Sequence, residues 1–186
     1  MSIPTTHHSG PWTVDDVLAL PEDAHHRVEL LGGVLLLTPN PDIPHQRAGS
    51  RLGALLAGAI EAHAAPLEVL KAVTVLVPDA LLVPDLVVAD TDAAAHAGAT
   101  LDATAITVAI EITSPTTHVI DQTLKPALYA AAGIPHYWRL ELEPVPRLHL
   151  GHLEHGTYTH RPVQAGETAV LTEPFPLDLD PATLRR

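Results

Sequence analysis

The run ITVAIEIT at Ile106–Thr113 constrains the fold most, because it is continuously apolar and rich in β-branched residues except at Glu111. Such a run predicts a β-strand that is buried on both faces. Ser114 and Pro115 follow it and end the strand. A carboxylate inside a buried strand is costly unless it is paired or binds a metal, which makes Glu111 a candidate site residue. The alternative is a carboxylate that simply reaches water at the strand end.

The rest of the chain predicts an α/β (α+β) fold with a mixed β-sheet flanked by helices. Two glycines, Gly32 and Gly33, separate two apolar runs and indicate a two-residue β-hairpin turn. The predicted elements, in chain order, are a helix after an N-cap at Thr13, the hairpin, a turn-rich connection at 39–44, a helix at 45–63, a strand at 69–77, a turn at 78–82, a strand at 84–89, a loop at 90–105, the strand Ile106–Thr113, a helix within 119–132, a strand at 136–142 and a terminal hairpin after Pro146. Residues 1–11 read as a disordered lead-in, and 12–186 as a single domain.

Asp85 follows Pro84 at the start of a predicted strand. If that strand lies beside Ile106–Thr113, Asp85 and Glu111 meet at one end of the sheet. Two carboxylates and a main-chain oxygen form the hard-oxygen site that Mg²⁺ prefers. Without a metal, two carboxylates held together should raise each other's pKa. On its own, a Pro-Asp pair is a weak signal, because it is common in turns.

Lys125 is one of two lysines in the chain, the other being Lys71. It lies on the predicted helix that follows the Glu111 strand, where helical spacing aligns it with Leu128 and Tyr129. We therefore expect its ammonium within about 6 Å of the Asp85 or Glu111 carboxylate. The alternative is an exposed lysine on the helix surface.

Taken in order, several short segments resemble the bacterial endonuclease family known as Uma-two, within the PD-(D/E)XK nuclease superfamily. The matching segments are VELLGG at 28–33, HQ at 45–46, PDLVV at 84–88, EITSPT at 111–116, Asp121, Lys125, Tyr129 and GIPHYW at 133–138. No single segment is specific, but the ordered set is. The resemblance implies a restriction-endonuclease-like core with an N-terminal hairpin and a C-terminal hairpin extension.

The resemblance also implies the roles of site residues. Asp85, Glu111 and the main-chain carbonyl of Ile112 would bind Mg²⁺ or Mn²⁺ for hydrolysis of phosphodiester bonds, with DNA as the expected substrate. Because cutting both strands favours paired sites, we also expect a homodimer. Superfamily members usually carry a lysine two residues after the glutamate, where this chain has Thr113. In this family the following helix supplies the lysine, which assigns that role to Lys125.

Four further residues take lesser roles by the same resemblance. Glu29 would be an auxiliary acid near the metal, although on the sequence alone an ordinary hairpin side chain fits it equally well. His45 and Gln46 begin the first long helix and would approach the metal, with capping of that helix as the alternative for His45. His118 stands where relatives often carry a basic residue that contacts phosphate. An unperturbed imidazole is mostly neutral at pH 7, so this departure weakens phosphate binding there.

The formal net charge of −12 is unfavourable for a nucleic-acid enzyme, because phosphate binding normally relies on clustered Lys and Arg. Two Trp, three Tyr and one Phe argue against a protein that stacks single-stranded bases on aromatic side chains. The chain has no cysteine, no apolar run long enough to span a bilayer and no signal peptide at its start, so we expect a soluble cytoplasmic protein.

Two alternative functions remain. The first is a catalytically inactive nuclease fold that serves as a binding or scaffold module, which the acidic charge and His118 favour. The second is a transition-metal protein that uses its histidines, several of which crowd 149–160. Alternation along a strand sends His149 and His152 to opposite faces, so solvated surface histidines are the favoured interpretation.

Overall fold

The computed structural model describes residues 8–21, 25–114 and 117–185. Its helices are α1 (Val14–Leu18), α2 (Ile43–Ala62), α3 (Thr91–His96), η2 (Ala103–Ala105), η3 (Ile120–Leu124), α4 (Lys125–Ala131) and α5 (Ala182–Arg185). Its strands are β1 (His26–Leu31), β2 (Val34–Pro39), β3 (Leu67–Lys71), β4 (Thr74–Val77), β5 (Ala80–Leu82), β6 (Leu86–Asp90), β7 (Thr100–Asp102), β8 (Ile106–Thr113), β9 (His136–Glu141), β10 (Arg147–Glu154), β11 (Thr157–Gln164), β12 (Ala169–Leu171) and β13 (Leu177–Leu179). Among the described residues, these strands form three sheets.

The largest sheet has six strands in the order β11-β10-β9-β8-β6-β3. Strand β8 lies inside this sheet, antiparallel to β6 and parallel to β9. Most of its residues, Glu111 included, are buried, as the continuous apolar run predicts. Strands β10 and β11 form the predicted C-terminal hairpin and extend the sheet at one edge.

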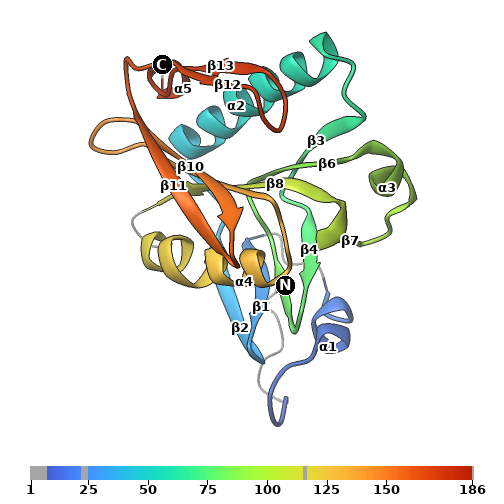
Figure 1. Cartoon of the computed structure of the whole chain (residues 1–186). Coiled ribbons are helices and arrows are strands. Elements are labelled where there is room, and N and C mark those ends of the chain that lie inside the picture. The colour runs from blue at the N-terminus through green and yellow to red at the C-terminus, as the bar shows by residue number, and fades with distance from the viewer. Residues whose placement is uncertain (1–7, 22–24, 115–116, 186) are drawn as a thin grey trace.

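Apolar side chains cover both faces of the six-stranded sheet. On one face, Leu52 and Leu56 of α2 pack in one cluster with Ile110 and Trp138. On the other face, a second cluster joins alternate residues of the same strands to the five-stranded sheet and α4. Figure 1 shows this layering, with α2 on one side of β8 and α4 with β1 and β4 on the other. Alternation along buried strands places Leu86 and Val87, for example, in opposite clusters.

The second sheet has five strands in the order β2-β1-β5-β4-β7. Strands β1 and β2 form the predicted N-terminal hairpin, in which Leu31 pairs with Val34 across the turn. Both turn residues, Gly32 and Gly33, have positive φ angles of 57° and 81°. That is the backbone a two-residue turn of this kind requires, and glycine adopts it without steric cost. The hairpin prediction is confirmed.

The prediction of one strand at 69–77 is wrong. The chain leaves the six-stranded sheet at Lys71, turns at Ala72 with a φ of 50°, and enters the five-stranded sheet as β4. The predicted turn at 78–82 is also shorter than expected. Only the Pro78-Asp79 corner turns, with Asp79 at a φ of 56°, and Ala80–Leu82 is a strand that pairs with both β4 and β1.

The helices also differ from the prediction in detail. Helix α2 begins at Ile43 rather than at His45, because Asp42 caps it by accepting a hydrogen bond from the His45 amide. The predicted helix within 119–132 is a π-helical turn, η3, followed by α4. Thr13 caps α1 as predicted, through a reciprocal capping box with Asp16. The predicted loop at 90–105 contains α3, β7 and η2.

The predicted lead-in at 1–11 lies partly outside the described residues, which begin at His8. In the described part, the His8 ring stacks on Trp12, with 3.8 Å between the ring centroids. Among the described helices, none is both long and apolar enough to cross a bilayer.

Candidate active site

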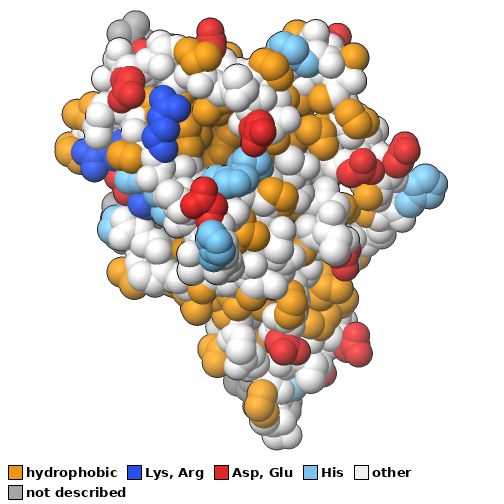
Figure 2. All heavy atoms as spheres, in the orientation of Figure 1, with side chains coloured by type: hydrophobic (Ala, Val, Ile, Leu, Met, Phe, Trp, Pro, Cys, Tyr) orange, Lys and Arg blue, Asp and Glu red, His pale blue; other side chains and the backbone are white. Residues whose placement is uncertain are grey.

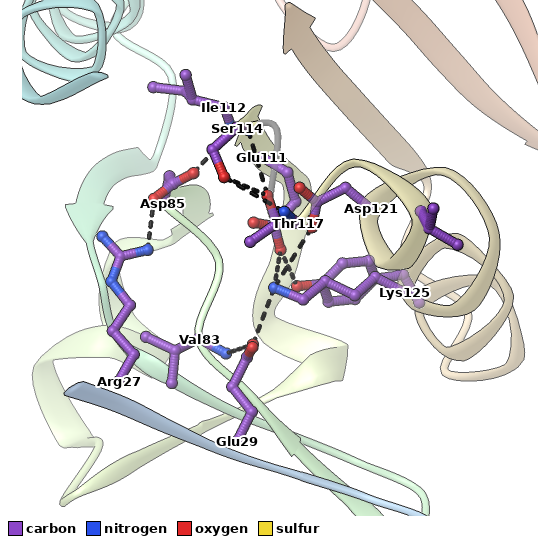
Figure 3. A network of polar contacts seen from close by, with 12 residues as sticks. Arg27, Glu29, Val83, Asp85, Glu111, Ile112, Ser114, Thr117, Asp121 and Lys125 are labelled. Carbon is purple, nitrogen blue, oxygen red and sulfur yellow. Dashed lines mark hydrogen bonds and ion pairs between the residues drawn. The ribbon is translucent and has the colours of Figure 1, made fainter. Parts of the chain in front are cut away.

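Five charged side chains from four separate parts of the chain meet between the two large sheets. They are Glu29 of β1, Asp85 immediately before β6, Glu111 of β8, Asp121 of η3 and Lys125 of α4. All five line one cavity of about 310 Å³, and each is buried, with exposed fractions from 1% to 8%. Figure 3 shows Lys125 directed between the carboxylates, with Asp85 turned towards Arg27. So many buried charges in one cavity are unusual unless they serve a site.

Lys125 joins three of the carboxylates. Its Nζ lies 3.0 Å from Glu111 Oε1, 2.9 Å from Glu29 Oε1 and 3.8 Å from Asp121 Oδ1. The prediction that this ammonium lies within about 6 Å of Glu111 or Asp85 is therefore confirmed. Burial alone would lower the pKa of Lys125, but the three carboxylates outweigh it and raise that pKa. Lys125 thus stays protonated and cannot take a proton from water.

Glu111 is fully enclosed. Its Oε1 accepts hydrogen bonds from Lys125 Nζ at 3.0 Å and from the Tyr129 hydroxyl at 2.9 Å. Burial raises its pKa well above the usual value, and Lys125 opposes that shift while Asp121, Asp85 and Glu29 add to it. The sequence analysis predicted that a second carboxylate nearby would raise the pKa of Glu111, and the pKa is raised as predicted. The alternative of a strand-end carboxylate in water is wrong.

Asp85 behaves differently, because its carboxylate has its own donors. Its Oδ1 lies 2.5 Å from an Arg27 nitrogen, and its Oδ2 accepts from the Ile112 amide at 2.7 Å and lies 3.1 Å from His45 Nε2. Burial acts to raise its pKa, but His45, Arg27 and the Ile112 amide outweigh burial and lower the pKa. The expectation that the two carboxylates raise each other's pKa is therefore wrong for Asp85.

Glu29 is not an ordinary hairpin side chain. It is 1% exposed, and its Oε1 accepts a hydrogen bond from the Val83 amide at 2.7 Å in addition to contacting Lys125. Because Val83 lies two residues before Asp85, Glu29 holds the segment that presents Asp85. Strand β1 thus supports the site from the five-stranded sheet.

Three other residues of the site had no role assigned from the sequence. Arg27 pairs with Asp85, Tyr129 donates to Glu111, and Asp121 contributes a fourth buried carboxylate. Asp121 Oδ1 has no hydrogen-bond partner among the described residues, and its pKa is raised, first by burial. The spacing of Asp121 and Lys125, four residues apart on one helical face, was the signal available for Asp121.

Of the remaining predicted residues, His45 and Ile112 line the cavity, whereas Gln46, Thr113 and His118 do not. His45 lines the cavity and contacts Asp85, so it does more than begin a helix. Gln46 turns away and donates to the Pro41 carbonyl at 2.7 Å. Thr113 and His118 line a neighbouring cavity, where His118 contacts Gln122 at 2.8 Å. Ile112 contacts Asp85 through its amide.

The residues present fit a divalent cation. Five carboxylates line one cavity, four of them buried and the fifth, Asp42, exposed, whereas Arg27 and Lys125 are the permanently positive side chains that line it, so an added dication would offset the excess negative charge. The donors are carboxylate oxygens, which Mg²⁺ prefers to nitrogen or sulfur. Within the described residues, no three His, Asp or Glu side chains converge as a preformed metal site. A divalent ion would therefore have to be held by fewer than three of these side chains, with main-chain oxygen and water completing its coordination.

The C-terminal histidines contact separate partners. His149 Nε2 lies 3.4 Å from Glu141 Oε1, while His152 lies across from His136, with ring centroids 5.0 Å apart. The cross-strand register pairs His149 with Arg139 and His152 with His136, and alternation sends the two histidines to opposite faces as predicted.

Comparisons with known proteins show the family and the fold of the chain. A family model described as "Uma2: Putative restriction endonuclease" matches residues 14–185. The chain is also similar to a crystal structure of a "putative nuclease belonging to DUF820" from Anabaena variabilis ATCC 29413, with a TM-score of 0.79 and 18% sequence identity. That match covers 94% of this chain and 97% of the other. At this identity it shows the fold alone, which is the predicted restriction-endonuclease-like α/β fold. No curated protein matches the sequence.

Proposed function

This chain belongs to the Uma2 family, the family that the sequence analysis called Uma-two, and on that premise we propose that it is a metal-dependent endonuclease that hydrolyses phosphodiester bonds in DNA. The single observation that supports this proposal best is the convergence of the buried side chains of Asp85, Glu111 and Lys125 in one cavity. A scaffold protein has no need to bury these carboxylates beside one another, because burial raises the pKa of Glu111 and Asp121 and their ionised forms therefore cost free energy.

In this proposal, Asp85 and Glu111 hold Mg²⁺ or Mn²⁺ together with the Ile112 carbonyl. When bound, such an ion polarises the scissile phosphate and lowers the pKa of a water ligand. Asp85 is suited to holding a cation because its lowered pKa keeps it ionised at neutral pH. Glu111 needs the cation more, because burial and neighbouring acids oppose its ionisation.

Lys125 serves as a fixed positive charge rather than as a base. Three carboxylates keep its ammonium protonated and hold it in place. A preorganised cation stabilises negative charge that develops on phosphate oxygens in the transition state. Glu29 and Tyr129 act through other residues, since Glu29 fixes Lys125 and the Val83 amide, and Tyr129 fixes Glu111.

Nucleic acid must approach a protein with little positive surface. On the face in Figure 2, Lys and Arg side chains gather at the upper left near the C-terminal elements, while acids and histidines are scattered over the rest. Weak non-specific affinity follows from a net charge of −12. We propose a homodimer as the active form, because two sites are needed to cut both strands together.

The decisive experiment is a cleavage assay on supercoiled plasmid and on single-stranded DNA, with Mg²⁺, Mn²⁺ or EDTA. We expect cleavage with either metal, none with EDTA, and loss of at least about 100-fold in Glu111→Gln, Asp85→Asn and Lys125→Met, since each removes charge stabilisation from the transition state. Exposed carboxylates provide matched controls, Glu61→Gln and Asp92→Asn, which should cut as the wild type does.

The same proteins distinguish an inactive binding module. Titration with Mg²⁺, followed by the melting temperature, should stabilise the wild type and the two control variants but not Asp85→Asn. Absence of cleavage together with absence of Mg²⁺ stabilisation in the wild type would favour the binding or scaffold function instead.

A further inference from the structure

A second cavity of about 200 Å³ opens beside Asp85, on the side of the active site nearest β3. It shares Arg27, His45 and Asp85 with the candidate active site, so the two cavities are contiguous. Its outer wall adds Ser50 of α2 and Lys71 at the end of β3. Lys71 is the other lysine of the chain, and no role in the active site accounts for it.

The backbone places Lys71 directly next to Asp85. In the register of β3 and β6, Lys71 pairs with Leu86, which follows Asp85 in the chain. The amide of the next residue, Ala72, donates to the Asp85 carbonyl at 3.2 Å. Ala72 holds a φ of 50°, an unfavourable backbone for a residue other than glycine. The corner that carries Lys71 is thus fixed to the segment that carries Asp85.

The Lys71 side chain lies across α2 rather than extending freely. Its Nζ donates to Ser50 Oγ at 3.4 Å. A Cβ atom added at Gly53 would meet the Lys71 Cε at 3.3 Å, so the absence of a side chain there makes room for the lysine stem. The ammonium and the Ser50 hydroxyl therefore sit together at the rim of the cavity, as two donors for one anion.

Among the described residues, no lysine or arginine lines the opposite rim of the active site. A cavity of about 460 Å³ on that side is also lined by His45, and it carries the carboxylates Asp42, Glu141 and Glu143, of which Glu141 pairs with Arg139 and Glu143 with Arg185. A polyanion that occupies the central cavity is therefore attracted towards Lys71 rather than towards this rim. The charges thus define one favourable direction for a bound strand.

We propose that Lys71 and Ser50 form a phosphate subsite that holds the backbone phosphate next to the scissile one, so that the bound polynucleotide leaves the active site over the α2–β3 corner. This inference rests on the proposed function. It makes an extended nucleic-acid strand the substrate, because a short phosphodiester would fill the central cavity without reaching Lys71. Lys71 is a positioning residue and takes no part in bond breaking.

The test compares Lys71→Gln and Lys71→Arg with the wild type on two substrates. The first is an oligonucleotide and the second is bis(4-nitrophenyl) phosphate, which has no neighbouring phosphate. We expect Lys71→Gln to raise KM for the oligonucleotide by about eightfold at 0.1 M salt, the effect of losing one phosphate contact by counterion release. Its hydrolysis of the small substrate and its kcat should stay unchanged, and Lys71→Arg should restore KM.

Binding without metal gives a second measurement. In EDTA, the salt dependence of oligonucleotide affinity should lose about one unit of slope in Lys71→Gln. Exposed Arg161 on β11 offers the matched control, because Arg161→Gln removes the same charge far from the α2–β3 corner. Glu143→Gln, on the acidic rim, should change oligonucleotide affinity less than twofold, since no phosphate contacts that rim.

The outcomes separate the two proposals. If the wild type cleaves the oligonucleotide but Lys71→Gln matches Arg161→Gln in KM and salt slope, the phosphate subsite is wrong while the endonuclease proposal stands. A loss of bis(4-nitrophenyl) phosphate hydrolysis in Lys71→Gln would also overturn it, because a positioning residue for a remote phosphate cannot affect that substrate. If the wild type neither binds nor cleaves the oligonucleotide, both proposals fail.

Discussion

At the scale of single residues, the site depends on one ammonium shared among buried acids. Lys125 contacts Glu111, Glu29 and Asp121, and these four side chains are each less than 5% exposed. No other lysine or arginine of the described residues is within ion-pair distance of those three carboxylates. Their compatibility with the folded state therefore rests on Lys125.

Replacing Lys125 by methionine should destabilise the protein by about 3–5 kcal/mol at pH 7, because the buried carboxylates lose their partner. Urea unfolding measures the loss. The double variant Lys125→Met/Glu111→Gln should recover part of it, since one of the uncompensated charges is removed. Equal stability of the single and double variants would show that Glu111 is not charged in the metal-free protein.

Asp85→Asn and Glu111→Gln should have opposite effects on stability at pH 7 in EDTA. Asp85 has a lowered pKa, so its ionised form contributes stability above the unfolded pKa of about 3.9, and that contribution is lost as pH falls through the folded value. Asp85→Asn should therefore cost about 1–3 kcal/mol at pH 7, and this cost should shrink progressively as pH falls below about 3.9. Glu111 has a raised pKa, so its ionisation costs stability as pH rises above about 4.3.

Glu111→Gln should consequently equal or exceed the wild type in stability at pH 7 and lose that advantage near pH 4. Urea midpoints across this pH range test both variants, with Asp92→Asn and Glu61→Gln as exposed controls. Destabilisation by both variants, with the same pH dependence, would contradict the separate electrostatic surroundings of the two acids.

At the scale of elements, the secondary structure was predicted correctly from the sequence where the local hydrophobic pattern matches the burial of the segment in the fold. The ITVAIEIT strand is buried on both faces, and its single acid identified the centre of the site. The segment at 69–77 was misjudged because its apolar pattern continues through Ala72, where the chain changes sheets. That break depends on the positive φ angle of Ala72, and the pattern of apolar and polar side chains does not predict a positive φ at an alanine.

The site residues also divide into those that could be predicted from the sequence and those whose role depends on the tertiary structure. Asp85, Glu111 and Lys125 could be predicted because they interrupt apolar segments or match an ordered set of motifs. Arg27 could not be assigned a role, because its partner Asp85 lies 58 residues away and the pairing exists only once β1 and β6 are brought together. Asp121 gave a weak signal, since its burial depends on the π-helical turn at Ile120–Leu124.

The N-terminal hairpin offers a prediction with a matched pair of sites. Gly32 and Gly33 both have positive φ, so alanine at either should cost about 1–2 kcal/mol. Gly33→Ala should cost more, because its Cβ would lie 2.8 Å from Pro11 Cβ, whereas nothing lies within 4 Å at Gly32. Melting temperatures of the two variants measure this, and Gly98→Ala, with ordinary φ and open space, is the control. An equal effect at Gly33 and Gly98 would contradict the turn.

At the scale of the whole molecule, the net charge of −12 sets how stability responds to salt. Repulsion among surface acids opposes the compact state, and salt screens it as the Debye length falls from about 30 Å at 0.01 M to about 8 Å at 0.15 M. The free energy of unfolding at pH 8 should therefore rise over that range. Near pH 5.4, the calculated isoelectric point, the same salt change should have much less effect. A fall in stability with salt at pH 8 would mean that favourable surface ion pairs dominate.

The site is assembled from segments that span much of the chain, and this bears on how such a protein is made. Glu29 emerges from the ribosome long before Lys125, and Tyr137 of β9 must follow before its hydroxyl can bond the Asp121 carbonyl at 2.6 Å. Strand β9 also has to take its place beside β8, whose Glu111 would otherwise sit at a sheet edge. A nascent chain that ends before β9 therefore has no enclosed site. The proposed endonuclease activity would therefore be acquired only in the last part of translation, and the nascent chain would not cleave nucleic acid during its own synthesis.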